Sequence, residues 1–177
     1  PVMKMLADVG QSAITASIMH KPWNGQTEDH YDSMVGRIKK LDGTWSYDYT
    51  VFDKWVTFMR EDVGIDGLIS CYTMIPWALR FDYYDQATSR IQFVEAAPGD
   101  TAYTDYWLPF LKDFARHLRE KGWFEQTAIS MDERPMEAMK GAIKIIREAD
   151  PAFKITLAGN YHAEIVDDLY YLAIPYG

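Results

Sequence analysis

The chain has 177 residues, of which 48% are hydrophobic and 25% are charged, and this composition is enough for one globular core. The formal net charge of -8 argues against a nucleic-acid partner, because phosphate binding needs clustered Lys and Arg. No apolar run approaches the roughly 20 residues that a membrane-spanning helix needs. The single cysteine, Cys71, lies in an apolar run and is predicted to be a buried thiol.

The first half of the chain contains a strand, a hairpin and a helix. Residues 13–19 form a strand-like run that ends at a polar and aromatic loop. Residues 34–40 and 44–49 flank Asp42-Gly43, a dipeptide typical of hairpin turns, so these two runs are expected to pair. The helix that follows ends near Gly64. Its apolar stripe is predicted to face the core and consists of Phe52, Trp55, Val56 and Met59.

The second half of the chain repeats the alternation of strands and helices. The expected elements are a strand over 67–73, a hairpin over 80–84 and 90–95, a helix over 105–121, a strand over 127–131, a helix over 136–148, a strand over 154–157, a short helix over 163–167 and a strand over 170–174. Gly122 and Asp150-Pro151 are expected to end the two long helices.

Five main strands that alternate with helices favour a parallel sheet with crossover helices. A closed (β/α)8 TIM barrel has eight strands and about 250 residues, so the chain is expected to form an α/β fold that is a partial barrel of about five to six strands. Residues 1–177 are then expected to be a single catalytic-barrel fragment, cut at both ends from a larger protein. The alternative is an open doubly wound sheet, although neither GxGxxG nor GxxxxGK[ST] occurs to support it.

Two adjacent carboxylates, Asp132 and Glu133, follow the strand-like run 127–131. Pro135 marks the change from strand to loop. In a barrel of alternating strands and helices, residues at the C-terminal ends of strands carry the chemistry. An Asp-Glu pair at such a position suits acid/base work on a sugar. The alternative is a solvated acidic loop in which Arg134 forms a local ion pair.

Hydrolysis of a glycoside needs a carboxylic acid to protonate the leaving oxygen and a second group to stabilise or attack the anomeric carbon. Neighbouring residues rarely reach opposite sides of one bond, so the pair fits a substrate-assisted scheme better. In that scheme the substrate's 2-acetamido carbonyl attacks, Asp132 orients this group and Glu133 donates the proton. Two alternatives stay open: a conventional retaining glycosidase that uses Glu133 with a distant carboxylate such as Glu164, and a carbohydrate-binding module without catalysis.

Aromatic residues make up 15% of the chain, and many lie where strands end and loops begin. Aromatic walls there suit the apolar faces of sugars. The candidate substrate-binding residues are His20, Trp23, Trp45, Trp77, Asn160, Tyr161 and His162. The four histidines show no metal-ligand spacing, so neither a metal nor another cofactor is expected. The absence of GxSxG argues against a serine hydrolase.

Several motifs together resemble the catalytic domain of glycoside hydrolase family 123 and its uncharacterised relatives. The resemblance extends from about Ala13 to Ile174, and the motif Met131-Asp132-Glu133-Arg134-Pro135 contains the carboxylate pair. The other stretches that carry it are residues 34–35, 39–49, 52–54, 71–77 and 81–85.

The resemblance implies a (β/α)8 barrel and β-N-acetylgalactosaminidase activity on a glycan or glycolipid, by substrate-assisted, retaining hydrolysis. It assigns Asp132 to the acetamido group, and it makes Glu133 the general acid and then the general base. In barrels of similar mechanism such a pair follows strand four, so 13–19 would be strand two and 170–174 strand six, with strands one, seven and eight outside the chain. Family members are typically exported bacterial enzymes, which implies an exported protein. Oligomeric state is not indicated.

Overall fold

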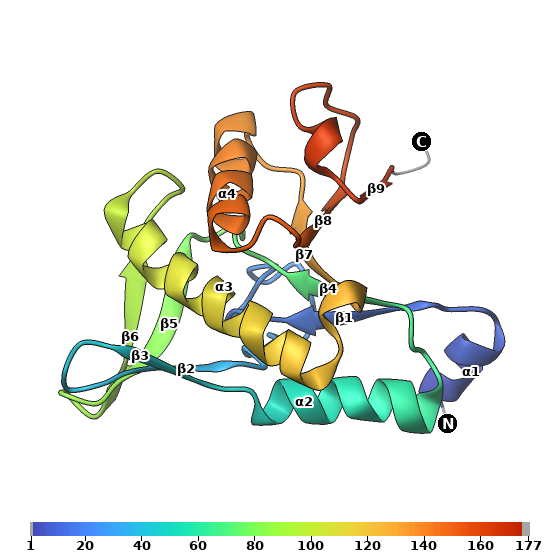
Figure 1. The fold of residues 1–177 in the computed structure, drawn as a ribbon, viewed down its shortest axis with the longest axis horizontal. Helices are drawn as coiled ribbons and strands as arrows, with labels where there is room; N and C mark the ends of the chain where they lie inside the picture. The colour runs from blue at the N-terminus through green and yellow to red at the C-terminus, as the bar shows by residue number, and fades with distance from the viewer. Residues whose placement is uncertain (1, 175–177) are drawn as a thin grey trace.

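The computed structural model describes residues 2–174, which form two β-sheets with helices packed on them (Figure 1). The larger sheet has five parallel strands in the order β1-β4-β7-β8-β9. These strands are β1 (Ala13–Ser17), β4 (Leu68–Tyr72), β7 (Thr127–Asp132), β8 (Lys154–Ala158) and β9 (Tyr171–Ala173). Each of the five predicted strands is therefore present, and every strand end lies within two residues of its predicted position.

One helix precedes the first parallel strand, and the others lie in the connections between successive strands. They are α1 (Val2–Asp8), α2 (Thr50–Thr57) with its π-helical continuation η1 (Phe58–Val63), α3 (Thr101–Lys121) followed by the 3-10 turn η2 (Phe124–Gln126), α4 (Met136–Ala149) and the 3-10 turn η3 (Val166–Asp168). Helix α3 begins one turn earlier than the sequence indicated, because Tyr103 is fully buried and extends its apolar face. None of the helices in residues 2–174 is long and apolar enough to cross a membrane.

The strand order of the larger sheet follows the order of the strands in the sequence, without a reversal. A doubly wound sheet reverses its strand order at a switch point, so the described strands do not support that alternative. Because crossovers between parallel strands are right-handed, an unreversed order places the connecting helices on one face, as in an α/β barrel. The described strands form an open sheet, and closure into the expected barrel is not seen in them.

The smaller sheet has four strands in the order β3-β2-β5-β6. Its strands are β2 (Gly36–Lys39), β3 (Trp45–Asp48), β5 (Arg80–Asp85) and β6 (Arg90–Glu95). Both hairpins were predicted, and Gly43 takes the left-handed conformation (φ 82°) that the first turn requires. The pairing of the two hairpins in one sheet was not predicted. Strand β2 pairs in parallel with β5, which joins the hairpin after β1 to the hairpin after β4.

The two faces of the parallel sheet differ in composition. The register aligns Cys71 with Ile129, and Ile129 with Ile155, on a buried apolar face. The opposite face carries small and polar side chains, including Ser130 and Thr156, whose hydroxyls are 2.7 Å apart. Because side chains alternate along a strand, Asp132 lies on the same face as Ser130. The first catalytic candidate therefore emerges from the polar face of the sheet.

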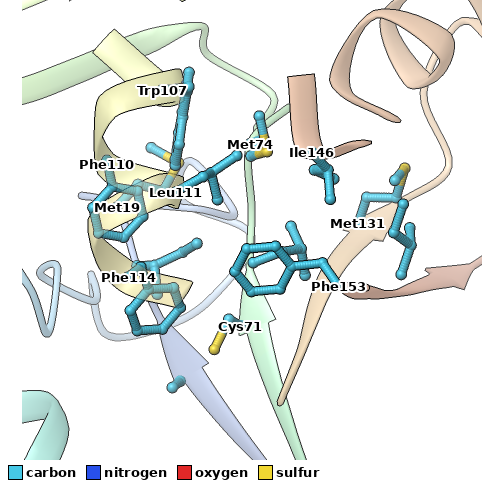
Figure 2. Close-up of a cluster of buried hydrophobic side chains, with 14 of the residues drawn as sticks. Met19, Cys71, Met74, Trp107, Phe110, Leu111, Phe114, Met131, Ile146 and Phe153 are labelled. Atoms are coloured by element: carbon cyan, nitrogen blue, oxygen red, sulfur yellow. The ribbon is translucent and has the colours of Figure 1, made fainter. Parts of the chain in front are cut away.

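Helix α3 lies over both sheets and carries half of the buried aromatic residues of the described chain. Phe114 stacks on Phe110 at 5.3 Å between ring centroids, and Tyr106 stacks on Phe81 of β5 at the same distance. Figure 2 shows Phe110, Phe114 and Cys71 in one buried cluster. Many of the aromatic residues of the chain therefore belong to the core. The predicted burial of the Cys71 thiol is confirmed, since Cys71 is fully buried.

Candidate functional site

The site begins where β7 ends. Asp132 is the last residue of β7 and is half-buried, and its neighbour Glu133 is the first residue of the loop that leads to α4. The Glu133 backbone N–H donates to the Ala158 carbonyl of β8 at 3.0 Å, which continues the ladder by one residue beyond the strand. Successive side chains of this extended backbone point in different directions, so the two carboxylates have different surroundings.

The Asp132 carboxyl lies among aromatic groups. Burial raises its pKa above the ordinary value, while interaction with the Trp23 indole and the positive charge of Arg134 partly oppose that rise. Tyr72, at the end of the neighbouring strand β4, lies close enough for the charge of Asp132 to raise the pKa of its hydroxyl, in addition to the larger effect of burial. The ring of Trp23 packs on Tyr72 with centroids 5.5 Å apart.

The Glu133 carboxylate is held by the loop that follows β8. Asn160 donates both its backbone N–H (3.0 Å) and its side-chain amide (2.9 Å) to Oε2. Nε2 of His162 lies 2.7 Å from Oε1. These hydrogen bonds, with that of the Asn160 backbone the largest effect, lower the pKa of Glu133. Asn160 and His162 thus fix the orientation of this carboxylate when no substrate is present.

Gly159 makes this arrangement possible. A Cβ built on Gly159 would lie 2.6 Å from Cβ of Glu133 and 2.9 Å from its Oε2, which is closer than real side chains approach. The Gly159 backbone N–H also donates to the Ala173 carbonyl of β9 at 2.9 Å, so the backbone at this position is fixed. A glycine is therefore required beside the second carboxylate.

Aromatic side chains flank the pair on the side of β1 and β4. Trp23 also contacts Tyr31 edge-to-face at 5.4 Å, and both come from the loop after β1. Trp77, in the loop after β4, is 47% exposed, and the guanidinium of Arg134 lies 4.2 Å from its ring centroid. Arg134 thus stacks on Trp77. In the part of the chain that the structure describes, it forms no ion pair with Asp132 or Glu133.

The other residues that were predicted to bind or act on the substrate make no described hydrogen bond to Asp132 or Glu133. Nδ1 of His20 lies 2.9 Å from Oδ1 of Asp32, so His20 is anchored within the loop after β1. Tyr161 is 60% exposed and projects from the loop that holds Glu133. Glu164, the alternative partner carboxylate, is exposed in the same connection between β8 and β9.

Trp45, one of the candidate substrate-binding residues, packs away from the loops that surround the carboxylates. It belongs to β3, and its ring packs edge-to-face on Tyr83 (5.3 Å) and Tyr106 (5.8 Å) in the contact between the smaller sheet and α3. The Asp42-Gly43 turn places it in a strand whose side chains pack on a helix. Trp45 is a packing residue there and is not brought to the carboxylate pair.

One pocket with apolar walls does not coincide with the carboxylates. It has a volume of about 640 Å³, runs along β1 between α1 and the loop after β1, and shares Trp23 with the site. Neither Asp132 nor Glu133 lines it. Within residues 2–174, no group of three or more His, Cys, Asp and Glu side chains has the arrangement of a metal site. The side chains that the structure places around the pair carry an amide (Asn160), an imidazole (His162) and aromatic rings (Trp23 and Tyr72).

Two contributors to the site were not anticipated from the sequence. Tyr72 was expected only as part of a strand, yet it ends that strand beside Asp132. Gly159 precedes Asn160 in a Gly-Asn-Tyr-His run directly after a strand, and a glycine at a strand end can signal close backbone approach. The sequence thus indicated a close approach at Gly159. It did not indicate that Glu133 is the residue approached, because that contact depends on the pairing of β7 with β8.

Comparison with known proteins identifies the family. The family model described as glycoside hydrolase 123, catalytic domain, matches residues 1–177. The chain belongs to glycoside hydrolase family 123. The resemblance carried by the sequence motifs is thereby confirmed.

A solved structure agrees with this assignment to family 123. It is a family 123 glycoside hydrolase from Clostridium perfringens, studied for the details of glycolipid glycan hydrolysis, with a TM-score of 0.88 and 32% sequence identity to this chain. The match covers 97% of this chain and 32% of that chain, so the family 123 chain described here spans about a third of the length of its structural relative. No curated protein sequence matches the chain.

Proposed function

We propose that the natural protein containing this chain removes terminal β-linked N-acetylhexosamine, with N-acetylgalactosamine favoured, from a glycan or glycolipid by substrate-assisted, retaining hydrolysis. The observation that carries the proposal is the pair Asp132 and Glu133 at the carboxyl end of β7, with one carboxyl half-buried and the other held by hydrogen bonds. Family membership supports the hydrolase activity, and the glycolipid glycan of the Clostridium perfringens relative supports the substrate class.

Asp132 has the position suited to the acetamido group. Its carboxylate accepts a hydrogen bond from the acetamido N–H, which orients the carbonyl oxygen toward the anomeric carbon. The bond from that oxygen to the anomeric carbon forms while the bond to the leaving oxygen breaks, giving a cyclic oxazolinium-type intermediate. Trp23 and Tyr72 exclude water around Asp132, and electrostatic interactions with the developing positive charge are stronger in such surroundings.

Glu133 supplies the proton to the leaving oxygen and then takes one from the water that opens the intermediate. Without substrate its pKa is lowered by Asn160 and His162, so it rests as a carboxylate. A bound sugar excludes water from Glu133 and competes for the Asn160 donors, and both effects raise the pKa of this carboxyl. Substrate binding thus favours the protonated form of Glu133. His162, with Nε2 2.7 Å from the Glu133 carboxylate, is placed to exchange the proton with it.

The test is hydrolysis of aryl N-acetyl-β-galactosaminide and its glucosamine epimer by the complete natural protein. Glu133→Gln is expected to reduce the rate by about 10² to 10⁴-fold, because general acid catalysis contributes that much. Asp132→Asn is expected to reduce it strongly as well. Glu137→Gln, an exposed glutamate in the first turn of α4, is the matched control and should leave the rate unchanged. Wild-type rates in both Glu133→Gln and Asp132→Asn would refute the proposal.

The two remaining alternatives give different results in the same assay. A conventional retaining glycosidase that used Glu133 with Glu164 would also cleave the matching sugar with a 2-hydroxyl in place of the acetamido group. A substrate-assisted enzyme rejects that sugar, because its nucleophile is part of the acetamido group. A carbohydrate-binding module would bind the sugar in calorimetry and release no product after long incubation.

A further inference from the structure

A second pocket has a volume of about 130 Å³ and is separate from the pocket along β1. The loop after β1, the loop after β4 and the smaller sheet build its wall together. Its lining residues are His20, Lys21, Asn24, Ala78, Arg80 and Phe93. The volume is well below the roughly 300 to 1,000 Å³ of a pocket for a whole small molecule, so the space suits one chemical group of a larger ligand.

The wall of this pocket is rich in hydrogen-bond donors. Lys21, Arg80 and Asn24 contribute an ammonium, a guanidinium and an amide, whereas Phe93 and Ala78 contribute apolar surface. No Asp or Glu is among the lining residues. This grouping of cations is notable on a chain with a net charge of -8, where carboxylates dominate the titratable groups.

Arg80 is held in place before any ligand binds. Its guanidinium carbon lies 3.4 Å from the centroid of the Phe93 ring, and its Nε lies 3.3 Å from a carboxylate oxygen of Glu95. Half of the Arg80 side chain stays exposed. A guanidinium fixed on an aromatic face loses little side-chain entropy on binding, and its planar fork matches carboxylate, sulfate and phosphate oxygens.

The loop that carries the other donors has an unusual backbone. Lys21 and Asn24 have φ angles of 53° and 43°, in the left-handed region that favours glycine. Hydrogen bonds maintain this conformation: the Lys21 N–H donates to the Tyr31 carbonyl at 2.8 Å, and the Asn24 N–H donates to the Lys21 carbonyl at 3.1 Å. Such strain persists only where the surrounding structure imposes it.

Two tryptophans connect the pocket to the carboxylate site. Trp23 lies between Lys21 and Asn24 in the sequence, and its indole interacts with Asp132. Trp77 precedes Ala78, and its ring lies against Arg134, which directly follows Glu133. A sugar held at Asp132 and Glu133 would therefore extend past these two rings toward the pocket.

We propose that this pocket binds a negatively charged group of the substrate, so that the enzyme prefers acidic glycans over neutral ones. The group is a sulfate ester on the N-acetylhexosamine or the carboxylate of the residue to which it is linked; Arg80 and Lys21 recognise the charge common to both. The inference rests on the proposed hexosaminidase activity.

The test compares three aryl N-acetyl-β-galactosaminides with the complete natural protein: an unsubstituted one, one with a 6-sulfate on the sugar and one with a carboxylate on the aryl group. At least one acidic substrate is expected to show a higher kcat/KM than the neutral one, and which of them does so identifies the source of the charge. Arg80→Gln is expected to reduce that preference about tenfold, since hydrogen bonds to charged groups contribute that order of energy. Arg90→Gln, at the exposed start of β6, is the matched control and should keep the preference.

Each result decides between the two proposals. Hydrolysis without preference for either acidic substrate, or a preference that Arg80→Gln leaves intact, overturns the pocket assignment while the hexosaminidase activity stands. If no substrate is hydrolysed, the activity proposal fails, and calorimetry with sulfated against unsulfated N-acetylgalactosamine then decides the pocket. Tighter binding of the sulfated sugar that disappears in Arg80→Gln supports the pocket, and equal binding overturns it.

Discussion

Glu133 occupies the space that a side chain at Gly159 would fill. The Cβ positions of the two residues would be 2.6 Å apart if Gly159 had a Cβ atom. The loop after β8 therefore approaches the end of β7 more closely than any other residue type at this position allows. This approach places Asn160 and His162 within hydrogen-bond distance of the Glu133 carboxylate.

Gly159→Ala is expected to impair catalysis with little loss of folding stability. The added methyl must displace Glu133 or the loop, and a shift of about 1 Å in a catalytic group costs on the order of 100-fold in rate. Measurement of kcat together with the thermal unfolding midpoint tests this. Gly36→Ala in β2, where the new Cβ would lie 3.3 Å from Cβ of Asp48, is the control and should retain the rate. An unchanged rate in Gly159→Ala would show that the close approach is not needed for activity.

His162→Gln is expected to move the basic limb of the kcat/KM profile to higher pH. His162 lowers the pKa of Glu133 through its hydrogen bond and its charge. The glutamine removes the charge, so the pKa of Glu133 rises, and the acid form required for proton donation persists to higher pH. The profile is measured with the aryl glycoside over the full pH range of the protein's stability. A basic limb that stays in place, or moves to lower pH, would contradict the role given to this histidine.

Phe114→Ala is expected to destabilise the fold by about 3 to 5 kcal/mol, the usual cost of removing a buried phenylalanine ring. Phe114 is fully buried and stacks on Tyr49 and Phe110. Chemical denaturation measures the change. Phe58→Ala is the matched control, because Phe58 is 44% exposed, and it should cost far less. Equal losses in the two variants would argue against α3 as the centre of the core.

Cys71 is expected to resist thiol reagents in the folded protein and to react fully in denaturant. The thiol is completely buried, and burial raises its pKa well above the ordinary value, so little thiolate forms at neutral pH. Labelling with a chromogenic disulfide in native and denaturing buffer measures this, and Cys71→Ala, which removes the single cysteine of the sequence, gives the background signal of the reagent. Rapid labelling of the native protein would mean that the core opens often enough to expose β4.

The parallel strands and the position of the carboxylate pair could be predicted because both depend on short, local sequence patterns. Apolar runs of the right length mark the strands, and Pro135 marks the end of β7 next to Asp132 and Glu133. The apolar stripe of α2 and η1 could also be predicted, since Phe52, Val56 and Met59 are buried as their spacing indicated, whereas Trp55 is only partly buried.

Features that depend on distant pairing could not be predicted. The β2–β5 pairing joins residues more than 40 positions apart, and neither hairpin contains a signal for it. The sequence also placed Asn160 and His162 near a sugar in general, whereas their contact with Glu133 depends on the register of β7 with β8. Trp45 shows the same limit, because a tryptophan after a turn has no local sign of the helix that will cover it.

The pairing of Ile38 with Tyr84 and of Lys39 with Asp85 has a mechanical consequence. The insertions after β1 and after β4, which supply Trp23 and Trp77, are anchored to one another through the smaller sheet and cannot swing apart independently. Two walls of the site therefore behave as one rigid frame.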